Sequence, residues 1–361
     1  MSSRNPTCLN LKAGEWVEVR GREEILATLD SQGRLENLPF MPEMLQYCGQ
    51  KLRVFKRADK TCQYLQGWSI RRVKDVVHLE GVRCDGTGHG GCEAGCLIFW
   101  KERWLKRVAG IAVPVKDLSE TDPSLGRTDG FCTVESILSA SQARNSEGER
   151  VYTCQATDVN KFTSHMRSLD PRQYIRDLRS GNLATGLSDD SRSGRALELV
   201  LGLIRILQAV TISLFNRLQA RRHGVVYPFI VGSLEKTPLE VLNLQAGELV
   251  QVKYKDEILA TLDKQNCNRG LLFDSEMLAY CGGIYKVSRR VKKIIDEKTG
   301  KLIEMKYPCI VLEGVVCRSD YHRLCPRAIY SYWRESWLVR AAPGLLPAKP
   351  QQLDAESAGE S

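Results

Sequence analysis

The sequence predicts an α+β protein in which two small, mainly antiparallel β-barrel modules are joined by a helical middle region. The first observation behind this prediction is a duplication: from Leu9 to Gln50, 24 of 42 residues are identical to those 233 positions later, without a gap. The second is that each copy consists of short alternating polar and apolar segments linked by polar turns, as in small barrels. We therefore expect a first module at 1–110, a linker and helical region at 111–236, a second module at 237–345 and a disordered tail at 346–361.

The first module opens with a pattern typical of a strand pair. Apolar and polar residues alternate over 16–20, a charged turn follows at 21–24, and a second strand is predicted over 25–29. The stretch LPFMPEML predicts one helical turn leading into Tyr47-Cys48-Gly49, and further strands are predicted over 51–55, 76–80 and 97–107. This opening resembles that of SH3-like barrels, and the resemblance implies an SH3-like fold for the first module. Residues 242–341 repeat the pattern strand for strand, so the same fold is expected for the second module.

The middle region has no counterpart in either copy. Residues 117–150 are rich in Ser, Glu, Asp and Gly and are predicted to form a loop, and 158–180 are predicted to be helical with an interruption at Asp170-Pro171. The strongest helix signal of the chain covers 194–222. Its narrow polar stripe consists of Glu198, Gly202, Arg205, Gln208, Asn216 and Gln219.

Two interpretations of the helix at 194–222 stay open. A transmembrane span needs about 20 apolar residues without a charge, and Arg205 interrupts this helix near its centre. One interpretation is therefore a helix buried against both modules. The other is a helix in peripheral contact with a membrane surface or in an oligomer, which the basic residues Arg217, Arg221 and Arg222 at its end favour.

Composition is that of an ordinary soluble protein, with 43% hydrophobic and 26% charged residues. The N-terminus has no apolar segment of the kind found in secretion signals, so we expect a cytoplasmic protein. In a reducing cytoplasm, the 13 cysteines indicate metal binding rather than disulfides. The net charge of +9 allows an acidic partner such as nucleic acid or anionic lipid, although the basic residues form no dense tract.

The duplication selects the candidate metal ligands. Neighbouring cysteines do not recur, since Cys62, Cys96 and Cys309 correspond to Ile295, Ile329 and Val76. One quartet of ligand-type residues does recur at identical spacing: Cys48, Cys84, His89 and Cys92 in the first copy, and Cys281, Cys317, His322 and Cys325 in the second. Three thiolates and one imidazole form a standard zinc shell with no open position. We therefore predict two structural zinc ions per chain, which stabilise modules too small to be stable alone.

A second recurring motif combines two tryptophans with an acid between them: Trp100, Glu102 and Trp104, repeated as Trp333, Glu335 and Trp337. In a strand these three positions share one face. One interpretation is an aromatic groove with a central carboxylate that binds a peptide or a cationic group. The alternative is a pair of core aromatics beside a charged rim.

No catalytic residue is assigned, because the shared acids Glu24/Glu257, Asp30/Asp263, Glu43/Glu276 and Glu80/Glu313 have no repeated nucleophile or base outside the quartet. In the middle region, Cys132, Cys154 and His165 are the candidates for an active site or a third metal site, with buried thiols and a surface histidine as the alternative. Basic residues at 71–74 and 289–293 would suit nucleic acid, but the two runs do not align and lack interleaved aromatic residues. Exposed hairpin loops explain them equally well.

The signature ATLD…EMLxYCG…LEGVxCDGxxHGGCxxGCLIFWKExWLKR resembles a family of uncharacterised bacterial proteins that accompany glycosyltransferase, sulfotransferase or specialised-metabolite genes. The likeness covers most of the chain, with a degraded form of the motif, CRSDYHRLCPRAIYSYWRESWLVR, in the second copy. It implies a bacterial, cytosolic setting and a biosynthetic context, with no activity attached. We expect a non-catalytic accessory or scaffold protein that binds a protein or peptide partner. The alternatives are an enzyme in polysaccharide or specialised-metabolite biosynthesis and a nucleic-acid-binding protein.

Overall fold

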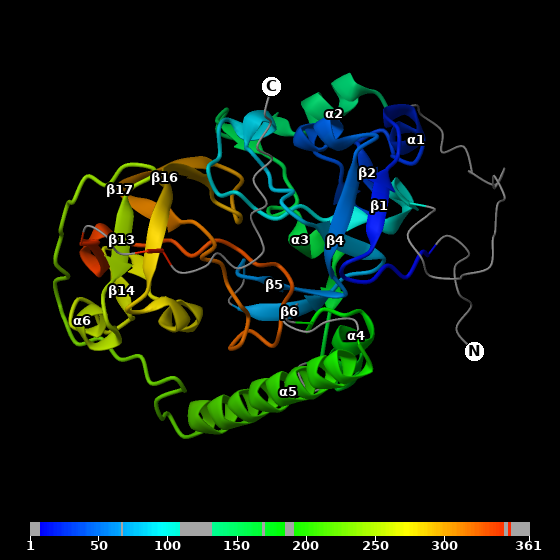
Figure 1. The fold of residues 1–361 in the computed structure, drawn as a ribbon. Coiled ribbons are helices and arrows are strands. Elements are labelled where there is room, and N and C mark those ends of the chain that lie inside the picture. The colour runs from blue at the N-terminus through cyan, green and yellow to red at the C-terminus, as the bar shows by residue number, and fades with distance from the viewer. Residues whose placement is uncertain are drawn as a thin grey trace. The chain divides into compact units, whose positions relative to one another are not determined.

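The computed structural model describes residues 8–65, 68–108, 132–167, 170–184, 191–342 and 346–347. It is an α+β structure with several small antiparallel sheets (Figure 1). The chain divides into two compact units, and the two copies of the duplicated segment lie mostly in different units. Unit 1 comprises Met1–Cys92, Leu97–Asn182 and Ile295–Leu302, and unit 2 comprises Glu93–Cys96, Leu183–Ile294 and Ile303–Ser361.

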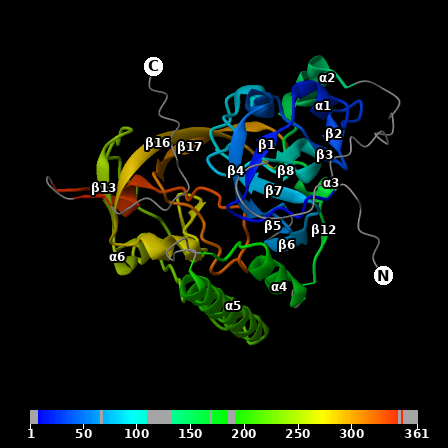
Figure 2. The ribbon, with the colours of Figure 1, turned by 45° about the vertical axis from the view of Figure 1, so that its right-hand side comes forward.

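Unit 1 is built on a five-stranded sheet in the order β8-β7-β4-β1-β9 (Figure 2). Its strands are β1 (Trp16–Val19), β4 (Lys51–Arg57), β7 (Val76–Leu79), β8 (Trp100–Lys101) and β9 (Leu105–Arg107). The first strand agrees with the alternating sequence pattern, because Val17 and Val19 are fully buried whereas Trp16 is 45% exposed. The strands predicted over 51–55 and 76–80 are also present.

The strand predicted over 25–29 is wrong, since this segment begins in the short helix α1 (Arg22–Leu26). The backbone N–H of Gly21 donates to the carboxylate of Glu24 at 2.8 Å, which satisfies one of the free donors at the helix start. Ile25 and Leu29 are both 1% exposed and are four residues apart, so they share the buried face. The second copy forms the same element as α6 (Lys255–Leu259).

Short 3₁₀ helices interrupt the strands of unit 1. The helical turn predicted from LPFMPEML is present as η1 (Pro42–Tyr47). The strand predicted over 97–107 is interrupted, because η3 (Glu102–Trp104) separates β8 from β9. Smaller elements of unit 1 are β2 (Arg34–Leu35), β3 (Leu38–Pro39), β5 (Lys60–Gln63), β6 (Ser69–Arg72) and η2 (Thr87–His89).

The middle region is more ordered than the loop predicted at 117–150. Residues 109–131 lie outside the described part, but the rest forms α2 (Val134–Ala140) and a hairpin of β10 (Gln142–Arg144) and β11 (Arg150–Tyr152). Thr133 caps α2 by accepting the backbone N–H of Ser136. The interrupted helix predicted at 158–180 is present as α3 (Val159–Phe162) and α4 (Arg172–Arg179), with β12 (Ser164–His165) between them.

Unit 2 repeats the strand pairing of unit 1. Its main sheet has the order β17-β16-β13-β18, and the pair Trp16↔Arg53 of the first copy recurs as Leu249↔Lys286. The duplication therefore extends from the sequence to the strand register. The elements are β13 (Leu249–Val252), β14 (Cys267–Asn268), β15 (Leu271–Leu272), η4 (Ser275–Tyr280), β16 (Ile284–Ile295), β17 (Leu302–Leu312), η5 (Glu335–Trp337) and β18 (Leu338–Arg340).

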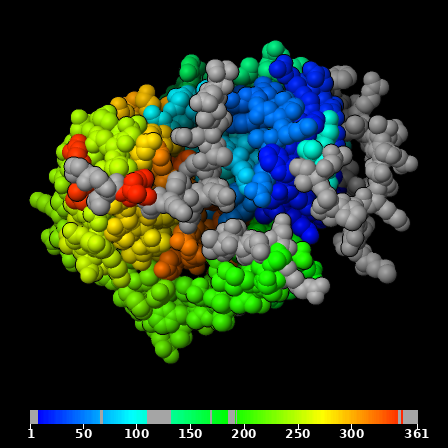
Figure 3. Space-filling view, in the orientation of Figure 1, coloured from blue at the N-terminus to red at the C-terminus, as the bar shows by residue number. Residues whose placement is uncertain are grey.

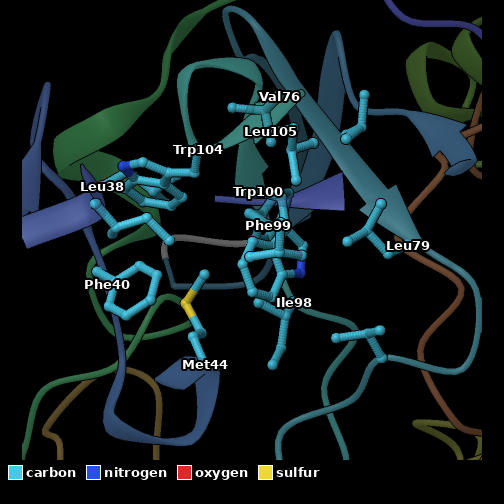
Figure 4. Packing of buried hydrophobic residues seen from close by; sticks show 14 of the residues in the cluster. Leu38, Phe40, Met44, Val76, Leu79, Ile98, Phe99, Trp100, Trp104 and Leu105 are labelled. Carbon is cyan, nitrogen blue, oxygen red and sulfur yellow. The ribbon is translucent and has the colours of Figure 1, made fainter. Parts of the chain in front are cut away.

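Each unit has a core centred on two tryptophans. In unit 1, Trp100 and Trp104 are fully buried and lie beside Phe40, Met44 and Leu105 (Figure 4). The rings of Phe40 and Trp104 meet edge to face, with centroids 5.2 Å apart. In unit 2, Phe273 and Trp337 repeat this contact at 5.3 Å.

The helix predicted at 194–222 is present as α5 (Arg192–Arg221), capped by the hydroxyl of Ser191. Among the described residues it is the one helix long and apolar enough to cross a membrane, judged by length and composition alone. The interpretation of a buried helix is wrong, because only 11% of the most apolar window of α5 is buried. Its surface is part of the space-filling view in Figure 3 (green).

Candidate metal centres

The first candidate centre joins η1 to the loop that follows β7. Within this loop, η2 is flanked by Gly86 and Gly90, whose φ angles of 78° and 65° lie in the left-handed region. A Cβ on Gly86 would lie 2.0 Å from the carbonyl oxygen of Cys92, so only glycine fits at this turn. The turn brings His89 back beneath η1, where Glu43 is located.

Glu43, Cys84 and His89 form a group whose ligand-type atoms all lie within 4.8 Å of one another. Glu43 Oε1 accepts the backbone N–H of Gly88 at 3.0 Å, lies 2.5 Å from His89 Nδ1 and is 3.7 Å from Cys84 Sγ. The side chains of Glu43 and His89 are 0% and 1% exposed. Glu43 Oε2 is buried without a hydrogen-bond partner among the described residues. A buried carboxylate oxygen of this kind is costly unless a cation or donor neutralises it.

The orientation of the His89 ring suits a metal ligand. Its Nε2 atom lies 3.1 Å from the backbone oxygen of Thr153, and because a carbonyl oxygen can only accept, Nε2 must carry the proton. In the neutral ring, the lone pair of Nδ1 then points at the carboxylate of Glu43. At 2.5 Å these two atoms are closer than two ligands of one tetrahedral ion, so here they share a proton, and an ion bound by both would require them to move apart. Metal-bound histidines usually donate their other N–H to an acceptor of this type.

The second candidate centre has the same construction in unit 2, with Glu276, Cys317 and His322. His322 Nδ1 lies 3.6 Å from Cys317 Sγ and 3.7 Å from Glu276 Oε1. These separations fall within the roughly 3.3–3.8 Å expected between ligand atoms of a tetrahedral zinc site with bonds of about 2.0–2.3 Å. His322 Nε2 lies 3.5 Å from the carboxylate of Asp274, so an oxygen acceptor faces the outer ring nitrogen in both copies.

Burial sets the protonation preferences of the second centre. Desolvation raises the pKa of Glu276 to about 7, although the backbone N–H of Tyr321 opposes this change. Desolvation also lowers the pKa of His322, against the attraction of Asp274. Both directions favour the uncharged form, because desolvation outweighs the opposing contacts of Asp274 and Tyr321.

The predicted zinc ligands and the observed groups overlap in part. Cys84 and His89 come together as predicted, and so do Cys317 and His322. The remaining cysteines are outside these groups: Cys48 and Cys281 follow η1 and η4 as C-cap residues, Cys92 Sγ accepts the backbone N–H of Ile295 at 3.3 Å, and Cys325 is buried. Glu43 and Glu276 were not among the ligands predicted from the sequence. Their recurrence five residues before Cys48 and Cys281 was the available signal.

The structure corrects the interpretation of the recurring tryptophans as a binding groove. Trp100, Trp104, Trp333 and Trp337 are all fully buried and belong to the two cores. Trp104 Nε1 donates to the Thr28 hydroxyl at 3.1 Å, and Trp337 donates to Thr261 at 2.9 Å. These indoles therefore hold α1 and α6 against the cores and present no surface to a ligand.

Replacing Thr28 with valine is expected to lower the free energy of unfolding by about 1–2 kcal/mol, because the buried indole N–H of Trp104 loses its acceptor. The Thr28→Ser variant keeps the hydroxyl and serves as the control. Urea denaturation of the three proteins measures the difference. Equal stability of Thr28→Val and the unchanged protein would contradict this role of the hydroxyl.

Glu102 and Glu335, predicted as ligand-binding acids, instead accept hydrogen bonds from the N-terminal segment of each module. Glu102 accepts the backbone N–H of Leu11 at 2.7 Å and pairs with Arg57, and its side chain is 0% exposed. Burial acts to raise the pKa of Glu102, but Arg57 and the hydrogen-bond donors outweigh burial and lower it. In the second copy, Glu335 makes the equivalent contacts with Leu244 at 2.8 Å and Arg290 at 2.5 Å.

A third group of ligand-type atoms consists of Cys8, Asp75 and Glu102. Cys8 Sγ donates to both carboxylates at 3.1 Å. Burial, together with these two acids, raises the pKa of Cys8 to about 12, so the sulfur stays a protonated donor. The position equivalent to Cys8 is Val241, and this group is therefore not part of the duplicated design.

Three pairs of shared acids have local structural roles. Glu24 and Glu257 cap α1 and α6, Asp30 and Asp263 accept backbone N–H groups in turns, and Glu80 and Glu313 form ion pairs with Arg53 and Lys286. The fourth pair, Glu43 and Glu276, belongs to the candidate metal centres. The structure thus separates one pair of shared acids from the others by its contacts with Cys and His.

The other candidate residues occupy ordinary structural positions. Cys132 is buried in the core of unit 1, Cys154 packs against the same core, and His165 is exposed in β12. The arginines of these runs are not in exposed hairpin loops, because Arg71 and Arg72 lie in β6 and bond to Thr163 and Asp170, whereas Lys74, Lys292 and Lys293 are exposed. In β16, Arg290 pairs with Glu335 and Arg289 lies over the ring of Tyr330. These arginines are engaged within the protein.

Comparisons with known proteins add no assignment. No family model matches the chain, and no curated protein matches it.

Proposed function

We propose that the chain is a non-catalytic scaffold protein whose two β-modules, of the SH3-like type, each contain one structural zinc ion. One observation carries this proposal. At equivalent positions of both modules, a buried carboxylate, a cysteine and a histidine lie together, and in each module an oxygen acceptor without a counterpart in the other faces histidine Nε2. The ligand-type side chains and their burial thus recur together, whereas a different group makes the outer contact of the histidine in each module.

The donor set favours zinc over hard cations. Zinc accepts thiolate, imidazole and carboxylate ligands in tetrahedral sites. A thiolate and an imidazole disfavour calcium and magnesium, which prefer oxygen ligands. Glu43, Cys84 and His89 would hold one ion, and Glu276, Cys317 and His322 the other. A cysteine of each predicted quartet is available nearby in sequence for the fourth position.

A structural role for the metal follows from the position of its ligands. Glu43 lies in η1 and is separated from Cys84 and His89 by 41 and 46 residues, so a shared ion cross-links two distant segments. The side chains of Glu43, His89 and Glu276 are almost completely buried, which leaves little room for a substrate. Small domains commonly rely on such a cross-link for stability.

The scaffold part of the proposal rests on the duplication. Two related modules in one chain raise the effective concentration for a partner with two binding elements. The resemblance to bacterial proteins that accompany biosynthetic genes supports an accessory role in such a pathway, with a protein or peptide as the partner.

Elemental analysis of the purified full-length chain is expected to find about two zinc ions per molecule. Removing them with a chelator should abolish the cooperative thermal transition, because each ion stabilises the fold. If the ions were catalytic instead of structural, removing them would leave the thermal transition nearly unchanged. The metal-loaded chain, used as bait with host extract, is expected to retain its partner equally well after Cys154→Ala replacement. Absence of metal, or a transition insensitive to chelation, would contradict the proposal.

A further inference from the structure

Helix α5 has the reverse of the polarity expected for a helix on a water-soluble protein. The most apolar 18-residue window of this helix has a mean hydropathy of 1.8, yet only 11% of it is buried. In an ordinary surface helix, the apolar stripe packs on the core and the polar stripe faces water. In α5 the polar stripe instead contacts the protein and the apolar stripe faces solvent.

The polar stripe of α5 faces the rest of unit 2. Arg205 pairs with Asp320 at 2.9 Å. The amide of Asn216 accepts the backbone N–H of Tyr227 at 2.7 Å and donates to its carbonyl at 2.9 Å. Gly202 and Ala209, on the same side, are buried. The polar residues therefore attach the helix to its own unit.

The opposite face of α5 is apolar and exposed to solvent. Leu207 is 67% exposed, and Leu199, Val200, Leu203, Ile204, Leu214 and Leu218 are each between 44% and 53% exposed. The segment after the helix also exposes Val225, Val226, Phe229 and Val231, and Phe229 lines the same hollow as Leu207. A helix of 30 residues is about 45 Å long. A continuous apolar strip of this length exceeds what a monomeric protein normally leaves in contact with water.

A second copy of α5 or a lipid bilayer could cover this apolar face, and the charges at the helix ends distinguish between the two. Exposed arginines lie at both ends of the helix, with Arg195 at the start and Arg217, Arg221 and Arg222 at the finish. In the sequence of 192–222, Glu198 is the single acidic residue. A second copy of α5, in either direction, would bring arginine against arginine at its ends. An anionic lipid surface would instead attract both ends.

A hollow of about 910 Å³ beside the helix also favours an anionic lipid as the partner of this face. Its apolar wall includes Ile212, Phe215 and Phe229. Its polar side contains Arg205 and Arg318, which share the carboxylate of Asp320 at 2.9 Å and 3.4 Å. Two guanidinium groups with one carboxylate leave one positive charge over, which suits the phosphate of a lipid headgroup beside an apolar chain.

We propose that α5 and residues 225–231 form a docking surface that lies in the interfacial plane of an anionic phospholipid bilayer. Because the polar stripe is bonded to unit 2, one face of the helix is available to lipid, and the helix does not cross the bilayer. The apolar side chains enter the boundary between headgroups and acyl chains, and the terminal arginines contact phosphates. No metal ion is part of this proposal, but Arg318 and Asp320 lie in the loop that also carries Cys317 and His322.

Flotation of the full-length chain with vesicles tests the docking surface. We expect the chain to float with vesicles of phosphatidylcholine and phosphatidylglycerol and to stay behind with phosphatidylcholine alone. Replacing Leu203 and Leu207 together with aspartate should lower the partition coefficient by about tenfold or more, and so should Arg217→Glu with Arg221→Glu. The matched controls are Leu239→Asp and Lys264→Glu, at exposed positions of unit 2 outside the helix.

Circular dichroism verifies that each variant is folded, which is expected because the replaced side chains are exposed. A chain that fails to float with anionic vesicles would overturn the proposal. So would variants that float like the unchanged protein. A vesicle-free dimer that dissociates on Leu207→Asp replacement, without flotation of the unchanged chain, would identify a second copy as the occupant and equally overturn it.

Discussion

Replacing Glu43 with glutamine is expected to reduce the zinc content from two ions to one and to unfold the first module. The change keeps the size of the side chain but removes the negative charge that faces His89 Nδ1 at 2.5 Å. Structural zinc contributes apparent binding energies of about 10–16 kcal/mol, which is comparable to or larger than the whole stability of about 5–15 kcal/mol of a typical domain. Elemental analysis and thermal denaturation measure the two effects.

Glu80→Gln is the matched control for this experiment, because Glu80 is also shared by the two copies. Its side chain is 31% exposed and pairs with Arg53 at 3.6 Å, so its loss should change neither the metal content nor the thermal transition appreciably. Glu276→Gln should reproduce the effect of Glu43→Gln in the second module. Retention of both ions by Glu43→Gln and Glu276→Gln would remove the two carboxylates from the ligand sets.

Cobalt substitution distinguishes the two ligand sets under consideration. A Cys3His shell, as predicted from the sequence, provides three thiolates for each ion, whereas the Glu–Cys–His group provides one. The charge-transfer absorption from thiolate to cobalt increases with each thiolate ligand. We expect the intensity of one or two thiolates per ion and a clear loss on Cys84→Ser replacement.

The duplication made most of the fold predictable. It implied the common strand register that places Trp16 opposite Arg53 and Leu249 opposite Lys286. Alternation was less reliable in short segments. The five residues from Ile25 to Leu29 fit a strand pattern, but a capping contact at Gly21 and the four-residue spacing of the buried side chains favour a helix.

Sequence separation explains what was missed at the candidate centres. Cys84 and His89 are five residues apart, so their spacing alone suggested a common site. Glu43 approaches them only after η1 and the loop following β7 have folded, and its repetition resembled that of the surface acid Glu80. Burial, which distinguishes a ligand from a solvated acid, is a property of the folded chain.

The orientation of α5 could not be predicted for a related reason. The sequence defines two stripes, but an apolar stripe normally turns inward. Hydrogen bonds and an ion pair from Arg205 and Asn216 determine the orientation, and their partners Asp320 and Tyr227 belong to other segments. The prediction of two stripes was therefore correct, whereas their assignment to protein and solvent required the structure.

Removing the guanidinium of Arg57 is expected to destabilise the first module by about 3–5 kcal/mol, since Glu102 would remain as an uncompensated buried charge. The Glu102 side chain is 0% exposed and that of Arg57 is 11% exposed, so solvent screens the pair weakly. Arg53→Ala, in the exposed pair with Glu80, should cost less than about 1 kcal/mol. Urea denaturation at neutral pH measures both variants.

The pH dependence of the Arg57→Ala effect separates charge from packing. Arg57 and the hydrogen-bond donors lower the pKa of Glu102 against the effect of burial, so the folded pKa lies below the unfolded value. A depressed pKa contributes stability that is present above the unfolded pKa of about 4.3 and is lost as the pH falls through the folded pKa. The stability difference between the unchanged protein and Arg57→Ala should therefore shrink in acid. A difference independent of pH would assign the loss to the packing of the Arg57 side chain instead of its charge.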